Sequence, residues 1–192
     1  MKGGENFWRK ILMGFLSCLM ITLLSGEKKN LAEPKVVEKV DLNRYLGKWY
    51  EIASIPAPFQ KQCAYGTTAN YSMGKEGMIE VLNQCWTKEG KLKSAKGRAW
   101  VVDEKSNAKL KVSFVPVVNW NFLAGDYWVI DLGKNYEYAV VGHPARKYGW
   151  ILAREPKIDK PVLDKIIKRL TEQGYDFSKF KFTEQKLPQS EK

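Results

Sequence analysis

The sequence predicts an all-β protein: an eight-stranded up-and-down antiparallel barrel with one C-terminal α-helix packed on its outside. Three observations lead to this prediction. Short segments with strand character recur between residues 49 and 154, and turn residues separate them. The connections are short, as in consecutive hairpins, whereas a sandwich needs long crossovers. The hydrophobic period then changes once, after residue 158, to that of a helix.

The N-terminal segment, residues 1–26, is predicted to be a signal peptide or membrane-targeting segment. Basic residues precede an uncharged apolar run, 11–24, which is shorter than the about 20 residues that a spanning helix needs. Cleavage, lipidation at Cys18 and retention as an anchor all remain open. Residues 27–39 are polar, so we expect a linker there and a single domain over residues 40–187. We therefore expect an exported protein that is periplasmic, associated with the outer membrane, or secreted.

Eight segments have the composition and alternation of strands. The clearest lies at 109–115, where Leu110, Val112 and Phe114 share one face and polar residues occupy the other, as in a half-buried antiparallel strand. Turns rich in glycine, proline and asparagine separate the segments. The expected strands are 49–55, 65–71, 78–86, 94–102, 109–115, 126–131, 136–141 and 149–154.

One amphipathic helix is predicted after the strands. Asp159 is a capping residue, Pro161 suits the first turn, and Gly174 is expected to end the helix. A single helix cannot bury its apolar face alone, so we expect it to lie against the outside of the sheet. The apolar residues at helical spacing are Leu163, Ile166, Ile167 and Leu170.

Three motifs occur in order along the chain. They are Gly47-Lys48-Trp49, Gly125-Asp126-Tyr127 and the segment 150–154. Together they resemble the three motifs of the lipocalin family, with glycine at position 125 where the family has threonine. Within the family, the chain looks closest to the bacterial outer-membrane lipocalins and apolipoprotein D. The resemblance, over about residues 40–185, implies that the Arg154 guanidinium stacks on the Trp49 indole. It implies structural roles for Gly47, Trp49, Asp126 and Arg154.

Alternation along the strands predicts the inner wall of the barrel, if the apolar face of 109–115 points inward. That wall is apolar and aromatic with few polar groups, which suits an acyl chain with a polar head. The segments 56–61 and 116–122 are expected to flank the mouth. The expected ligand-binding residues are Ala69, Tyr71, Val81, Asn83, Val112, Phe114, Tyr127, Val129, Tyr138, Trp150 and Leu152.

Cys63 and Cys85 form an even set beyond the N-terminal segment, which favours a disulfide in an exported protein. If the hairpin between them turns at Gly74, Ala69 faces Ile79 and the two cysteines lie opposite each other at bonding distance. We therefore predict a disulfide. The alternative is a pair of free thiols, one of them a nucleophile within the barrel.

Several function classes have little support in the sequence. The net charge is +11, but the lysines are spread along the chain and no nucleic-acid recognition motif accompanies them. His143 is the only histidine, so we expect neither a metal site nor a catalytic triad. No phosphate-binding loop is present, and we expect no cofactor. Nucleic acid is accordingly not an expected partner.

The expected function is to bind, and store or transport, a small hydrophobic ligand at the cell envelope, without turnover. A fatty acid or a lysophospholipid is the expected ligand. Two alternatives remain open: an enzyme on the same scaffold that acts on a lipid through Cys85 or Asp126, and a filled barrel that binds envelope partners. The sequence also allows peripheral contact with a membrane and a homodimer.

Overall fold

The computed structural model describes residues 31–115 and 123–186. The expected targeting segment, with Cys18, and the mouth segment 116–122 lie outside these residues. None of the helices in the described part of the chain has the length and apolar composition needed to span a bilayer.

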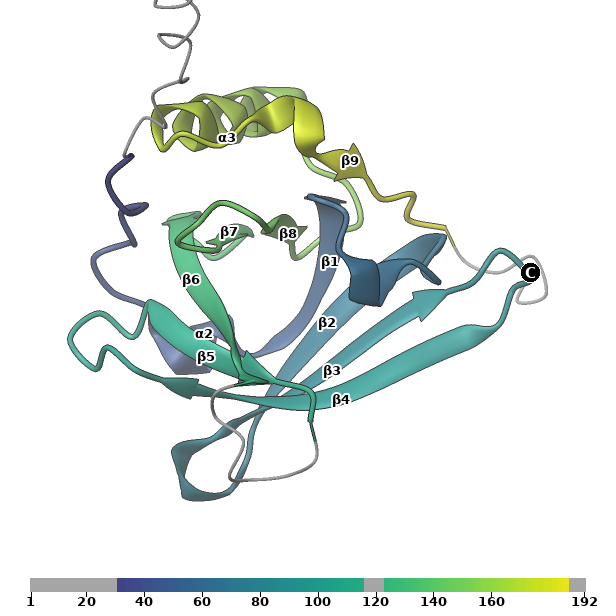
Figure 1. Cartoon of the computed structure of the whole chain (residues 1–192), viewed down its shortest axis with the longest axis horizontal. Helices are drawn as coiled ribbons and strands as arrows, with labels where there is room; N and C mark the ends of the chain where they lie inside the picture. Colours follow the sequence, from purple (N-terminus) through teal and green to yellow (C-terminus); the bar gives the residue numbers. More distant parts are fainter. Residues whose placement is uncertain (1–30, 116–122, 187–192) are drawn as a thin grey trace, which may run out of the picture. The chain divides into compact units, whose positions relative to one another are not determined.

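The strands form one closed antiparallel sheet in the order β2-β3-β4-β5-β6-β7-β8-β1-β9, and β1 also pairs with β2. Figure 1 shows the strands around a common interior, with α3 outside, next to β7 and β8. The predicted eight-stranded barrel is thus confirmed. The strands are β1 (Gly47–Ser54), β2 (Tyr65–Met73), β3 (Ile79–Trp86), β4 (Leu92–Val101), β5 (Lys109–Ser113), β6 (Gly125–Leu132), β7 (Tyr138–Gly142), β8 (Gly149–Ala153) and the short β9 (Lys181–Phe182).

The described residues contain two α-helices, α2 (Leu42–Tyr45) and α3 (Lys160–Glu172), and three 3-10 turns, η1 (Pro58–Gln60), η2 (Lys75–Gly77) and η4 (Phe177–Lys179). The Asp41 carboxylate caps α2 by accepting hydrogen bonds from the backbone N–H groups of Asn43 and Arg44. The sequence does not predict α2, because one turn is too short to show a helical period, and it does not predict the two-residue β9.

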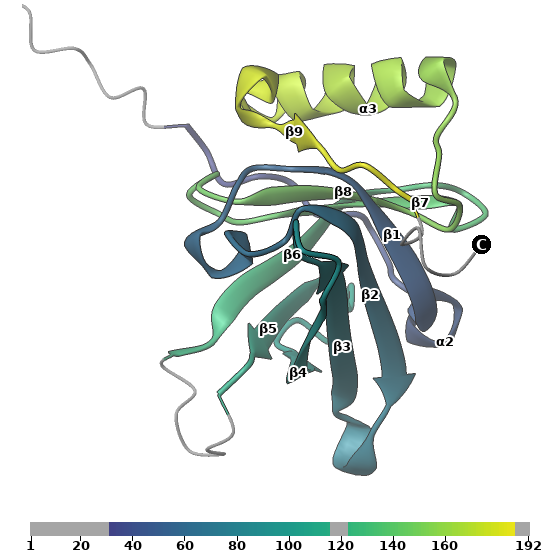
Figure 2. The ribbon, with the colours of Figure 1, turned by 90° about the vertical axis from the view of Figure 1, so that its right-hand side faces the viewer.

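The two faces of the sheet bury two apolar cores. The inner core includes Trp49, Val129 and Leu152. The outer core joins Ile166 and Leu170 of α3 to the outer faces of β7 and β8, and Figure 2 shows α3 along that side of the sheet. The prediction that the helix covers the outside of the barrel is confirmed.

The predicted linker, residues 27–39, is packed against the barrel in its second half. The backbone N–H of Val37 donates to the carbonyl of Val129 at 3.0 Å. Val36 and Val37 pack on the inner core, and Val40 is buried within it. Residues from Glu33 onward therefore belong to the same compact unit as the barrel.

Trp49 lies at the end of the barrel where α2 is found, and none of its surface is exposed (0%). Its indole N–H donates to the carbonyl of Tyr45 at 2.8 Å. The centre of the Arg154 guanidinium lies 3.8 Å from the indole ring. Arg154 also donates to the carbonyls of Lys48 at 2.9 Å and Arg44 at 2.7 Å. The expected stacking of Arg154 on Trp49 is present.

The turn between β6 and β7 also belongs to this end. The Tyr136 hydroxyl accepts a hydrogen bond from the backbone N–H of Asp41 at 2.8 Å, and the Arg44 guanidinium lies over the Tyr136 ring. The backbone N–H of Arg154 donates to the carbonyl of Glu137. Asp126, for which we expected a structural role, makes its ion pair elsewhere, with Lys111 at 2.8 Å.

The predicted disulfide between Cys63 and Cys85 is present, with 5.4 Å between the Cα atoms. The register that led to this prediction was wrong, because Ala69 pairs with Asn83 and not with Ile79. The hairpin turns through η2, where Glu76 has a φ of 56°, instead of at Gly74. Cys63 precedes β2 and reaches Cys85 across a register shift between residues 65 and 68. A register shift, and not the direct pairing expected from Gly74, therefore brings the cysteines together.

Candidate functional site: a cavity within the barrel

The barrel encloses a cavity of about 570 Å³ that opens at one end. All eight long strands contribute to its wall, and its volume is in the range of sites that hold small molecules. Ten of the eleven residues expected to bind a ligand line it. They are Ala69, Tyr71, Val81, Asn83, Val112, Phe114, Tyr127, Val129, Trp150 and Leu152.

Tyr138 is the exception, and the prediction that it faces the cavity was wrong. Its side chain lies in the outer core beneath α3, and its hydroxyl donates to Asp131 at 3.3 Å. Ala139 and Val141 are the residues of β7 that face inward. Every residue of β7 is buried, because α3 covers the outer face of that strand. An apolar strand with two buried faces has no polar face from which to read its orientation.

Three tyrosines meet at the end of the cavity nearest Trp49. The Tyr127 hydroxyl lies 2.8 Å from that of Tyr45 and 2.9 Å from that of Tyr71. Burial raises the pKa of Tyr71 to about 12 and holds the pKa values of Tyr45 and Tyr127 well above their usual range. All three hydroxyls are therefore neutral at physiological pH and bonded to one another.

Asn83 supplies a polar atom to the cavity wall. Its Oδ1 is buried and has no hydrogen-bond partner in the described part of the protein. A buried acceptor without a donor costs about 1–3 kcal/mol, and a ligand hydroxyl or amide that enters the cavity can supply the donor. Its ladder partner Ala69 and the pair Tyr71 and Val81 give the wall apolar and aromatic surface, whereas Thr68 and Gln84 on the other side of Asn83 are polar.

The open end carries exposed apolar side chains. Phe59 is 60% exposed, Leu123 48% and Phe114 40%, and all three line the cavity. In Figure 2 the connection from β1 to β2, which carries η1, lies at the opposite end of the barrel from α2. The Trp150 indole N–H donates to Gln60 of η1 at 3.3 Å. η1 therefore borders the mouth as expected.

Cys85 and Asp126, on which the enzymatic alternative depends, both have partners. Cys85 is bonded to Cys63 and so has no thiol. Asp126 pairs with Lys111 and lies 4.0 Å from His143, whose pKa is lowered by burial. Among residues 31–115 and 123–186, no three His, Cys, Asp or Glu side chains gather as a metal site would require.

The sequence of residues 40–185 matches a family model described as a lipocalin-like domain. Temperature-induced lipocalin-1 of Arabidopsis thaliana is 39% identical over 171 residues, which cover 86% of this chain and 86% of the relative. Outer membrane lipoprotein Blc of Vibrio cholerae is 36% identical over 169 residues, 87% of this chain and 95% of the relative. Apolipoprotein D of Mus musculus is 34% identical over 188 residues, 91% and 95% of the two chains.

Solved structures show the same fold at lower identity. Insecticyanin from the tobacco hornworm Manduca sexta superposes with a TM-score of 0.61 at 21% identity, covering 83% of this chain and 86% of that one. Apocrustacyanin C1 superposes with a TM-score of 0.60 at 15% identity, covering 76% and 80%.

Proposed function

Because this chain belongs to the lipocalin family, we propose that it binds, and stores or transports, a fatty acid or a lysophospholipid without chemical turnover. The open cavity of about 570 Å³ with a mainly apolar wall is the observation that supports this proposal. Each methylene group that leaves water for such a wall contributes about 0.8 kcal/mol. The cavity also argues against the alternative in which side chains fill the barrel.

Titration of lipid-free protein tests the proposal. Trp150 lines the cavity, so its fluorescence should change in a saturable way when palmitate or a palmitoyl lysophospholipid is added. A Trp150→Phe variant should lose most of that change and keep its affinity by calorimetry. Wild-type protein that gives no saturable response to either lipid would overturn the proposal.

We infer also that the protein is exported. The Cys63–Cys85 disulfide is of a kind that persists in oxidising compartments, and the uncharged apolar run at 11–24 has the composition expected of a targeting segment. One relative is named as an outer membrane lipoprotein. Fractionation of cells that make the wild type and a Cys18→Ser variant tests this inference. Wild-type protein found only in the cytoplasm would contradict export, and a lipid mass that disappears in the variant would identify Cys18 as its attachment site.

The mouth supports a proposal of peripheral membrane contact. Phe59 and Leu123 are exposed there, and Lys61 follows η1 directly. Apolar side chains beside a basic group favour an anionic bilayer surface. Sedimentation with phosphatidylglycerol vesicles should therefore depend on salt and weaken in a Phe59→Ser variant. Equal sedimentation of the two proteins would contradict this proposal.

A further inference from the structure

A second hollow, of about 260 Å³, lies where β1 and β2 separate. Direct pairing of these strands stops at Tyr50 and Thr68. Beyond that point the C-terminal segment fills the gap: Thr183 donates its backbone N–H to Ile52, and Gly66 donates to Glu184. Four residues line both the hollow and the main cavity, so they separate the two spaces. They are Glu51, Gln60, Cys63 and Thr67.

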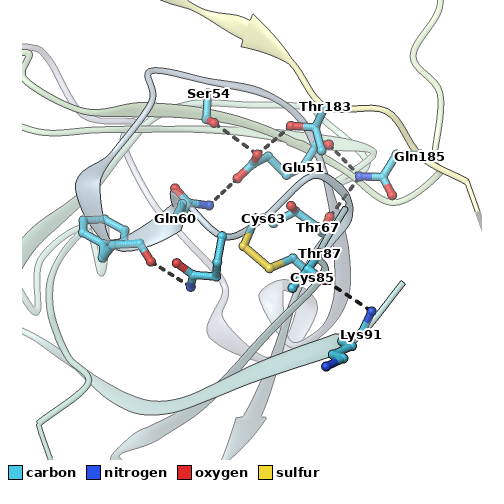
Figure 3. The surroundings of a disulfide bond; sticks show 12 residues. Glu51, Ser54, Gln60, Cys63, Thr67, Cys85, Thr87, Lys91, Thr183 and Gln185 are labelled. Atoms are coloured by element: carbon cyan, nitrogen blue, oxygen red, sulfur yellow. Dashed lines mark hydrogen bonds between the residues drawn. A yellow bond between two sulfur atoms is a disulfide. The ribbon is translucent and has the colours of Figure 1, made fainter. Parts of the chain in front are cut away.

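Glu51 is a buried carboxylate in this partition, with 6% of its surface exposed. Its Oε1 accepts hydrogen bonds from the hydroxyls of Ser54 at 3.1 Å and Thr183 at 2.6 Å. Its Oε2 accepts one bond, at 3.0 Å, from the side-chain amide of Gln60. Figure 3 shows the carboxylate among these three groups, beside the disulfide.

None of the donors to Glu51 carries a charge. Glu51 takes part in none of the ion pairs formed within the described part of the chain. A buried carboxylate is costly unless a cation pairs with it. Each carboxylate oxygen has about two lone-pair sites, so Oε2, with one bond from Gln60, keeps one position for a further donor.

Two basic residues line the outer side of the same hollow. Lys61 and Lys181 both contribute to its wall, and both are exposed. A buried anion with cations outside it complements a zwitterion whose ammonium group points inward and whose phosphate points outward. The neighbouring cavity has space and an apolar surface for the acyl chain of the same molecule.

We propose that Glu51 determines headgroup specificity by accepting a hydrogen bond from the primary ammonium of a lysophospholipid. This inference rests on the function proposed above. Gln60 positions the carboxylate, and the Cys63–Cys85 bond holds the connection that carries Gln60 against β3. The primary ammonium of an ethanolamine headgroup can donate an N–H to this carboxylate, whereas a quaternary ammonium has no N–H to donate.

Two lipids with the same acyl chain test the proposal: 1-palmitoyl lysophosphatidylethanolamine, and 1-palmitoyl lysophosphatidic acid, which lacks the ethanolamine group and has a phosphate monoester in its place. Calorimetry should show that the wild type binds the ethanolamine lipid at least about tenfold more tightly, as expected for one charge-assisted bond. Glu51→Gln should lower the affinity for the ethanolamine lipid to the affinity for lysophosphatidic acid. The affinity for lysophosphatidic acid should stay within about twofold. Lys61→Ser serves as a control and should lower the affinity for both lipids alike.

Three results would overturn the inference: equal wild-type affinity for the two lipids, a preference that survives in Glu51→Gln, or an equal loss for both lipids in that variant. In each case palmitate binding would still support the proposed function. Failure of both phospholipids and of palmitate to bind would instead refute the proposed function itself. The wild-type comparison needs no variant, so it stands even if Glu51→Gln does not fold.

Discussion

Replacement of Arg154 by alanine is expected to lower the free energy of unfolding by about 3 kcal/mol. The guanidinium stacks on the ring of Trp49, which is completely buried, and such a contact contributes about 1–2 kcal/mol. Its two hydrogen bonds, to the carbonyls of Lys48 and Arg44, contribute about 1 kcal/mol each where water competes for them. The same loss corresponds to a fall in Tm of about 6–12 °C for a domain of this size.

Urea denaturation of the wild type, Arg154→Ala and Arg154→Lys measures this loss. The lysine variant keeps the charge but has no planar group to stack or to donate to both carbonyls, so it should fall between the other two. Lys96→Ala on the exposed face of β4 is the matched control, because it removes one positive charge and no packing. An Arg154→Ala protein as stable as Lys96→Ala would refute a structural role for the stack.

The disulfide, the tyrosines and the cavity wall can each be tested separately. Cys85→Ser should lower the free energy of unfolding by about 3 kcal/mol, since it opens a loop with a sequence separation of 22; urea denaturation with and without a reductant measures this. The free energy of unfolding should fall as the pH rises from about 10 to 12. The pKa of Tyr71 is about 12 in the fold and about 10 in the unfolded chain, so between these values the unfolded chain loses the proton first and is favoured. Denaturation at a series of pH values measures this fall. Val81→Trp should abolish palmitate binding by filling the cavity, whereas Tyr138→Phe should leave it unchanged, and fluorescence titration separates the two.

Local patterns predicted most of the fold. The alternation at Leu110 and Val112 predicts both that the segment is a strand and which of its side chains face inward, because only one face of β5 is apolar. The same reasoning could not orient β7, where Tyr138 and Ala139 are both buried. The disulfide was predicted from the number of cysteines and their spacing, although Cys63 reaches its partner across a register shift that the sequence does not show.

The partition around Glu51 was missed, and part of it could have been found. Glu51 follows Trp49 by two residues, so strand alternation assigns both side chains to the inner face. An inward carboxylate in an apolar wall is a signal that sequence alone provides. Its partners are not predictable in that way, since Thr183 lies 132 residues away along the chain and reaches Glu51 only through the C-terminal segment.

The distribution of polar groups also orients the proposed ligand. The hydroxyls of Tyr45, Tyr71 and Tyr127 near Trp49 are neutral and bonded to one another, so an apolar chain that covers them breaks no bond to a charged group. Near the mouth, Glu51 is held by Gln60, which also binds the indole of Trp150. A head-first ligand would move its charge away from water and away from this carboxylate, at a cost of several kcal/mol. The chain should therefore enter first, toward the tyrosines, and the headgroup should remain beside Glu51.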